Sequence, residues 1–217
     1  MNGYVSSIIF DMDGVIVDSH LHWRSVQAEF LQSLIAGWNE SLQKSILGMS
    51  VYDLHKLLQR NFDLKLSSEE FIERYRGLST EIYGNRCRAF PGVCELITAL
   101  VNDGVVVAIV SSSPRAWIDL VIARYNLKVD RVISSEDVGT RTKPDPEIYK
   151  FALTSLQLTA SEVIAVEDSE KGINSATGAG IRCVGYRNGY NNEENFSKAA
   201  WQISDFSKFR ETIRGIS

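Results

Sequence analysis

Short apolar runs recur along the chain, and a stretch with helical character follows each of them. The runs span residues 4–10, 105–110, 131–134, 163–166 and 182–186. Nearly every position in them is apolar, which is typical of strands that are buried on both faces of a parallel sheet. Alternation of such strands with helices predicts an α/β fold, in which helices sandwich a Rossmann-like parallel sheet.

Three segments between the strands are predicted to be crossover helices. Residues 92–102 place apolar side chains at helical spacing and end at Asp103-Gly104. Ser113-Pro114 and Asp145-Pro146 each combine a capping residue with a proline suited to the first turn, so a helix is expected to begin at each proline. The strongly polar segment 188–194 is most simply interpreted as a surface loop.

Residues 17–87 break the alternation, because they show helical periodicity and no clear strand. About 70 residues are too many for one crossover helix. We therefore predict an inserted all-helical cap subdomain at 17–87, standing over one end of the sheet, and an α/β core formed by residues 1–16 and 88–217. Pro91-Gly92 is expected to mark the return to the core.

The composition is that of an ordinary globular protein of one to two domains, with 217 residues, 44% hydrophobic and 23% charged. The net charge is −4, so no basic field would attract nucleic acid or anionic lipid, and any phosphate recognition must be local. Three cysteines, widely spaced and without a CxxC pair, predict reduced thiols. With no basic, apolar leader and no long apolar run, we expect a cytoplasmic protein without a membrane partner.

Polar residues follow the predicted strands directly and also precede one of the predicted helices. In an open parallel sheet, ligands bind beyond the carboxyl ends of the strands, near the point where the strand order reverses. Four such clusters are present: Asp11-Met12-Asp13-Gly14, Ser111-Ser112-Ser113, Thr142-Lys143-Pro144 and Glu167-Asp168-Ser169. We expect these side chains to gather at one edge of the sheet.

Together these residue types suit phosphoryl transfer, which needs a nucleophile, a proton donor and positive charge. Two unit charges about 4 Å apart repel by roughly 4 kcal/mol at an effective dielectric constant near 20, so an aspartate needs compensation to approach a phosphate. Lys143 supplies one positive charge. Asp11, Asp168 and Glu167 would repel one another without a hard divalent cation, which predicts a bound Mg²⁺.

The four clusters resemble, in order, the motifs of the haloacid dehalogenase-like superfamily of phosphohydrolases. The resemblance rests on Asp11-x-Asp13-Gly14-Val15, Ser111, Lys143-Pro144 and Glu167-Asp168-Ser169-x-x-Gly172, and it covers nearly the whole chain. It is closest to the branch of β-phosphoglucomutase and small sugar-phosphate phosphatases, which carries a helical cap. It implies a Mg²⁺-dependent phosphatase that hydrolyses small phosphorylated metabolites, such as sugar phosphates, through an aspartyl-phosphate intermediate.

The resemblance also implies roles for individual residues. Asp11 would be the nucleophile, and Asp13 would protonate the leaving oxygen, later activate water, and lend its backbone carbonyl to the metal. Ser111 and the amide of Ser112 would hold the phosphoryl oxygens, while Lys143 would neutralise them and orient Asp11.

The remaining predicted site residues are the acidic pair and one residue of the cap. Asp168 would anchor Mg²⁺ directly or through water, and whether Glu167 binds the metal directly is left open. Trp23, at the start of a cap helix, either lines the substrate pocket or packs inside the cap. The cap would close over the substrate and exclude solvent.

Two other functions compete with hydrolysis by a monomeric phosphatase. In the mutases of the branch a cap histidine and a basic pair around a glycine hold the intermediate, whereas this chain has Trp23 and the stretch Leu47-Gly48-Met49-Ser50-Val51 at those places. These losses favour hydrolysis, although His22 lies one position from the expected histidine and keeps the mutase alternative open.

A phospho-accepting receiver-like domain would be a non-enzymatic switch, but it would have neither the helical insertion nor a second aspartate at position 13. Asp13 also weighs against dehalogenation.

Overall fold

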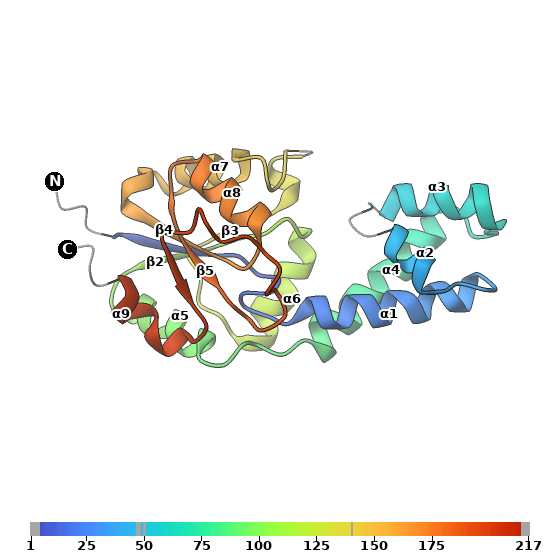
Figure 1. Cartoon of the computed structure of the whole chain (residues 1–217), viewed down its shortest axis with the longest axis horizontal. Helices are drawn as coiled ribbons and strands as arrows, with labels where there is room; N and C mark the ends of the chain where they lie inside the picture. The colour runs from blue at the N-terminus through green and yellow to red at the C-terminus, as the bar shows by residue number, and fades with distance from the viewer. Residues whose placement is uncertain (1–4, 47–48, 50, 140, 214–217) are drawn as a thin grey trace. The chain divides into compact units, whose positions relative to one another are not determined.

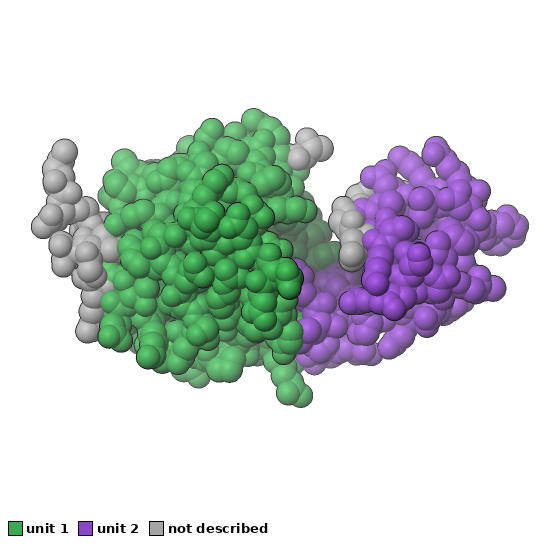
Figure 2. All heavy atoms as spheres, in the orientation of Figure 1, with its two compact units in different colours: residues 1–18, 88–217 green, residues 19–87 purple. Residues whose placement is uncertain are grey.

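The computed structural model describes residues 5–46, 49, 51–139 and 141–213, and its chain divides into two compact units. Unit 1 comprises residues 1–18 and 88–217, and unit 2 comprises residues 19–87 (Figure 2). The glycine-centred stretch 47–51, on which the comparison with the mutases depended, lies largely outside the described residues, because 47, 48 and 50 are not among them. Each unit has a hydrophobic core of its own.

Unit 1 is built on a six-stranded sheet with the order β3-β2-β1-β4-β5-β6, in which every neighbouring pair is parallel. The strands are β1 (Ser7–Phe10), β2 (Val106–Val110), β3 (Arg131–Ile133), β4 (Val163–Glu167), β5 (Arg182–Tyr186) and β6 (Trp201–Ile203). The predicted parallel α/β fold is confirmed. The strand β6 was not predicted, and β4 runs one residue further than expected, through Glu167.

Helices cover both faces of this sheet, with α7 and α8 on one face and α5 and α9 on the other (Figure 1). The helices of unit 1 are α5 (Val93–Asn102), α6 (Arg115–Tyr125), α7 (Glu147–Leu156), α8 (Glu170–Gly178) and α9 (Phe209–Ile213). Short 3-10 turns at Ser135–Asp137, Ala160–Glu162 and Phe206–Lys208 complete the connections.

Alternate residues of each strand face opposite helix layers, because side chains along a strand point to opposite sides. Ile9, Ala108 and Ala165 belong to a fully buried cluster that also contains Tyr149 of α7 and Ile173 of α8. On the other side, the ring of Phe10 lies 6.3 Å from that of Phe209 in α9. Burial on both faces explains why the strands are almost uniformly apolar in sequence.

The two helices expected to begin at prolines begin one residue later, at Arg115 and Glu147, and they differ in capping. Pro146 directly precedes α7, and the carboxylate of Asp145 accepts a hydrogen bond from the Glu147 amide at 2.8 Å. Pro114 occupies the N-cap position of α6, where no side chain caps the helix. The expectation that Ser113 caps this helix is therefore wrong, because its hydroxyl is engaged by Asp13 instead.

Unit 2 is entirely helical over its described residues. Its elements are α1 (Ser19–Leu34), α2 (Glu40–Ser45), α3 (Val51–Phe62), α4 (Ser68–Glu81) and a π-helical turn (Ile82–Arg86). The caps follow from the sequence: Asn39 accepts from two amides of α2, and Ser67 and Glu70 form a reciprocal capping box at α4.

The core of unit 2 joins side chains from all of its helices. Leu31, Leu54, Leu58 and Phe71 are at most 1% exposed and pack together with Trp38. None of the helices in the described ranges is both long and apolar enough to cross a membrane.

Candidate active site

The strand order reverses between β1 and β4, and this is where the predicted site residues of unit 1 meet. From β1 the chain adds β2 and β3 on one side, and then crosses to add β4, β5 and β6 on the other. The loops that follow β1 and β4 therefore diverge and leave a crevice at the carboxyl edge, the usual ligand site of such sheets. Asp11 follows β1 directly, and Glu167 and Asp168 stand at the end of β4.

Lys143 joins two of these carboxylates. It lies in the loop before α7 with its side chain only 7% exposed, and its Nζ is 2.7 Å from Asp11 Oδ1 and 2.7 Å from Glu167 Oε1. The same ammonium group donates to the carbonyl of Val110, the last residue of β2, at 3.0 Å. One cation thus ties the ends of three neighbouring strands together.

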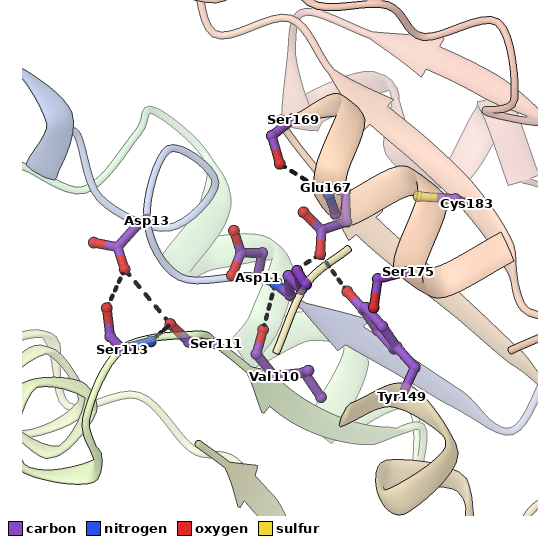
Figure 3. Close-up of polar contacts among 12 residues, drawn as sticks. Asp11, Asp13, Val110, Ser111, Ser113, Tyr149, Glu167, Ser169, Ser175 and Cys183 are labelled. Carbon is purple, nitrogen blue, oxygen red and sulfur yellow. Dashed lines mark hydrogen bonds and ion pairs between the residues drawn. The ribbon is translucent and has the colours of Figure 1, made fainter. Parts of the chain in front are cut away.

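Asp11, Glu167 and Asp168 form a compact acidic triad. Each offers one carboxylate oxygen, these oxygens lie within 4.8 Å of one another, and all three residues are buried. Glu167 also accepts a hydrogen bond from the hydroxyl of Tyr149 at 2.5 Å (Figure 3). The sequence did not single out Tyr149, which reads as one of the apolar positions of α7.

Burial and crowding raise the pKa values of the triad. Burial raises the pKa of Glu167 to about 8, even though the ammonium of Lys143 lowers it. Burial also raises the pKa of Asp11 and, with the nearby Asp11 carboxylate, that of Asp168. For Lys143, burial would lower the pKa, but Asp11 and Glu167 outweigh it and the pKa is raised. With all three carboxylates ionised, the site would carry more negative charge than one lysine offsets.

The triad meets the requirements for holding a hard divalent cation. Its donors are all carboxylate oxygens, which Mg²⁺ prefers. Glu167 Oε2 is buried and has no hydrogen-bond partner among the described residues, although buried carboxylate oxygens are normally paired. A cation between these groups would give that buried charge a partner and relieve the repulsion among the carboxylates, which adds to the effect of burial on their pKa values.

Two glycines allow the loops to approach one another this closely. A Cβ atom on Gly14, whose φ is +80°, would lie 1.9 Å from Asp168 Oδ2, and one on Gly172 would lie 1.8 Å from Glu167 Oε2. Neither distance leaves room for a side chain. Ser169 accepts from the Gly172 amide at 3.0 Å and caps α8.

Asp13 points toward the serine-rich turn after β2. Its Oδ2 accepts a hydrogen bond from Ser113 Oγ at 2.7 Å and a longer one from Ser111 Oγ at 3.5 Å (Figure 3). Ser111 is buried and accepts from the Ser113 amide at 3.0 Å, whereas Ser112 beside it is exposed. The structure thus brings Asp13 and Ser111 together as expected, and adds Ser113 to them.

Trp23 belongs to unit 2, whereas the acidic triad and Lys143 belong to unit 1. The ring of Trp23 stacks on that of Tyr75 with centroids 5.6 Å apart, and its indole N–H donates to the hydroxyl of Tyr83 at 3.0 Å. Within unit 2, Trp23 has the contacts of a packing residue.

The segment after β5 contributes two residues that the sequence analysis missed. Asn188 Nδ2 donates to Asp168 Oδ2 at 3.0 Å, and Asn191 Nδ2 donates to the backbone carbonyl of Asp168 at 2.7 Å. Residues 188–194 do form a loop with exposed positions at 189, 190, 192 and 193, but the prediction missed that Asn191 is buried and that both asparagines bind Asp168. Their place directly after a buried strand was the signal that could have found them.

A parallel α/β sheet with buried carboxylates and one lysine at its switch point defines a class of proteins suited to metal-assisted chemistry on anionic ligands. The chain belongs to the haloacid dehalogenase-like hydrolase family, whose model matches residues 8–186. It is thus a haloacid dehalogenase-like hydrolase, as the order of its motifs suggested.

Relatives with assigned names support this placement. A "Phosphorylated carbohydrates phosphatase" of Thermotoga maritima is 28% identical over 181 residues, covering 83% of this chain and 84% of that protein. "Protein CbbY" of Rhodobacter capsulatus is 29% identical over 215 residues and 94% of each chain.

The fold also matches solved structures over nearly its whole length. A putative beta-phosphoglucomutase from Thermotoga maritima superposes with a TM-score of 0.78 at 24% identity, covering 95% of this chain and 99% of that one. CbbY from Rhodobacter sphaeroides, solved in complex with phosphate, gives a TM-score of 0.76 at 20% identity, covering 94% and 96%.

Proposed function

We propose that this protein is a Mg²⁺-dependent phosphatase that hydrolyses phosphorylated sugars or similar small phosphomonoesters through a phosphoryl group carried on Asp11. The observation that carries the proposal is the bond from Lys143 to Asp11 inside the acidic triad at the sheet's switch point. It gives a carboxylate a fixed orientation and a neighbouring positive charge, the two things an anionic nucleophile needs near phosphate.

In the first step, a carboxylate oxygen of Asp11 attacks the phosphorus and the bond from phosphorus to the sugar oxygen breaks. Asp13 gives its proton to that leaving oxygen, so the product departs as a neutral alcohol. Ser111 and the Ser112 amide bind the transferring oxygens, and Lys143 offsets their charge while it holds Asp11 in place.

In the second step, Asp13 takes a proton from a water molecule that attacks the phosphorus of the aspartyl-phosphate. The bond from phosphorus to Asp11 breaks, the Asp11 carboxylate is restored and inorganic phosphate leaves. The proton that Asp13 gave to the product is thereby replaced, and the sum is hydrolysis of one phosphomonoester by one water.

The residues that would hold Mg²⁺ are Asp11, Asp168 and Glu167, together with the backbone carbonyl of Asp13. When bound, Mg²⁺ supplies positive charge that lets the nucleophile and the phosphate approach and that stabilises charge in the transition state. The buried and unpartnered Glu167 Oε2 supports including Glu167 among these ligands.

The class of substrate is proposed from the named relatives. One is called a phosphorylated carbohydrates phosphatase and another an N-acetylmuramic acid 6-phosphate phosphatase, at 28% and 23% identity.

Trp23 is retained as a proposed substrate-binding residue of unit 2. Because its N–H is bound to the hydroxyl of Tyr83, it would offer its ring to the substrate. A monomeric, cytoplasmic protein stays a prediction from the sequence.

The proposal is tested by measuring phosphate release with Mg²⁺ from a panel of sugar phosphates, phosphoglycolate and nucleoside monophosphates. We expect release from at least one sugar phosphate, and its loss both with chelator and in Asp11→Asn, by about 10³-fold or more. Asp119→Asn, an exposed aspartate of α6, is the matched control and should retain full activity. Release that survives Asp11→Asn would refute the nucleophile, and isomerisation of a glucose phosphate without release would favour a mutase.

A further inference from the structure

Asn188, in the loop after β5, contacts two separate parts of the site at once. Its Nδ2 donates to the carbonyl oxygen of Gly14 at 2.9 Å and to Oδ2 of Asp168 at 3.0 Å. Gly14 belongs to the turn that carries Asp11 and Asp13, whereas Asp168 follows β4. A single side-chain amide therefore links the loops that follow β1 and β4.

The orientation of this amide is fixed by its surroundings. A backbone carbonyl and a carboxylate are both acceptors, so the group that faces them must be the NH₂ end, which has two protons to give. The opposite end, Asn188 Oδ1, accepts from the amide of Tyr190 at 2.9 Å. Both ends of the amide are thus used, and flipping it would place an acceptor against two acceptors.

A second asparagine holds the loop in which Asn188 lies. Asn191 Nδ2 donates to the backbone carbonyls of Asp168 and Tyr186 at 2.7 and 2.8 Å. Its Oδ1 accepts a hydrogen bond from the backbone N–H of Asn188 at 3.2 Å. Asn191 is only 8% exposed. These hydrogen bonds hold the loop to Tyr186, at the end of β5, and to Asp168, whose carboxylate Asn188 contacts.

The two groups that Asn188 joins are already in close contact. A Cβ atom on Gly14 would lie 1.9 Å from Asp168 Oδ2, so the backbone of the turn and the carboxylate have no space between them. Without this donor, the Gly14 carbonyl oxygen and Asp168 Oδ2 would each lose a hydrogen bond at a buried position. The amide therefore satisfies two acceptors that belong to different loops.

We propose that Asn188 is a positioning residue that sets the distance between Asp11 and Asp168, and thereby the affinity of the acidic triad for a divalent cation. The inference rests on the proposed function in taking that triad as the metal site. By binding Oδ2 of Asp168, Asn188 fixes the rotation of the carboxylate, and by binding Gly14 it fixes the turn that carries Asp11. Residues that orient metal ligands in this way typically contribute about 10–100-fold to affinity.

The test is a titration of the whole protein with Mn²⁺, followed by electron paramagnetic resonance of the free ion, so that no turnover is needed. We expect Asn188→Ala to bind Mn²⁺ at least about tenfold more weakly than the wild type. Asn192→Ala, an exposed asparagine of the same loop, should bind as the wild type does. In activity assays, Asn188→Ala should need more Mg²⁺ for half-maximal rate, with most of the rate restored at saturating Mg²⁺.

A purely structural role for Asn188 predicts a different result. Thermal unfolding in chelator would then show a lower midpoint, while the Mn²⁺ affinity of the folded variant would stay within about twofold of the wild type, and this would overturn the inference. If Asn188→Ala does not fold, Asn188→Ser, which keeps one donor but cannot reach both acceptors, replaces it in the same titration with the same criterion. A wild type that binds Mn²⁺ but releases no phosphate would refute the proposed function and leave this comparison intact.

Discussion

At the scale of single residues, the site depends on how a few polar groups share hydrogen bonds. Asp13 is an example, because its Oδ2 accepts from Ser113 at 2.7 Å and more weakly from Ser111 at 3.5 Å. The proposed mechanism requires Asp13 to deliver a proton to one atom of the substrate, which needs a defined rotamer. The short hydrogen bond from Ser113 holds the Asp13 carboxylate in one rotamer.

Ser113→Ala should therefore lower kcat by about 10–100-fold, since a hydrogen bond to a charged group is worth about 1.5–3 kcal/mol and each 1.4 kcal/mol is a factor of ten. The KM for substrate should change little, because the bond orients Asp13 rather than the substrate. Steady-state kinetics on the best substrate of the panel measure both. Ser197→Ala, at an exposed position, is the control, and equal kcat values for the two variants would contradict the role of Ser113.

Glu167 makes the stability of the metal-free protein depend on pH. Burial raises its pKa from 4.5 to about 8 in the folded chain, so between these values the folded state binds more protons than the unfolded state. The free energy of unfolding should then fall as the pH rises through this window. Lys143 does not oppose the trend, because its pKa is raised and it stays protonated throughout.

Thermal unfolding in chelator between about pH 5 and about pH 8 checks this expectation. The midpoint should fall with rising pH in the wild type, and Glu167→Gln should show a shallower fall because it has no proton to lose. Asp11 and Asp168, whose pKa values are also raised, account for the slope that remains. Equal slopes in the two proteins would show that Glu167 is not the group that titrates.

The sequence predicted most of the site's residues, because charged groups directly after uniformly apolar strands stand out. Asp11, Lys143, Glu167 and Asp168 were all expected, and the structure places them together. Asn188 escaped notice, because a run of asparagines and glutamates has the composition of a solvated loop. Neutral amides act here through their orientation, and orientation is set by long-range contacts that composition does not record.

At the scale of elements, the close contact between α8 and the end of β4 depends on a glycine. Gly172→Ala would place a Cβ 1.8 Å from Glu167 Oε2, so the carboxylate must move and the metal site must distort. We expect a loss of about 1–3 kcal/mol in the free energy of unfolding, as for other overpacked sites, together with weaker Mn²⁺ binding.

Gly77→Ala provides the matched control for this prediction, because Gly77 lies exposed inside α4 with no atom near the added Cβ. Here alanine should stabilise the helix by about 0.5–1 kcal/mol. Denaturant unfolding measures the change in the free energy of unfolding for each variant, which should be a loss for Gly172→Ala and a gain for Gly77→Ala. A Gly172→Ala protein as stable as the wild type would show that α8 can move away from β4.

The elements themselves were predictable to different degrees. The four longer strands, β1, β2, β4 and β5, were visible because burial on both faces removes nearly all polar residues from them, and the three-residue β3 was visible from its apolar Val132 and Ile133. The sixth, Trp201–Ile203, has three residues with an exposed glutamine at its centre, and it exists because β5 offers an unpaired edge. The capping of α6 was misjudged for a similar reason, since a tertiary bond to Asp13 outcompetes the local one for Ser113.

At the scale of the whole molecule, the two units have separate hydrophobic cores, and the acidic triad lies entirely in unit 1. Leu58→Ala, which empties a fully buried position of unit 2, should lower local stability there by about 2–5 kcal/mol. Amide hydrogen exchange should accelerate in α1, α3 and α4, while β1, β2 and β4 keep their protection. Equal loss of protection in both units would show that they unfold as one.

The central claim is that Asp11 carries the phosphoryl group during turnover. Sodium borohydride added during turnover reduces an acyl phosphate to an alcohol, which converts an aspartyl-phosphate to homoserine, and peptide mass spectrometry locates the change. The account predicts homoserine at position 11, formed only when both substrate and Mg²⁺ are present. Homoserine at position 13, or phosphate release with no modified peptide at all, would contradict it.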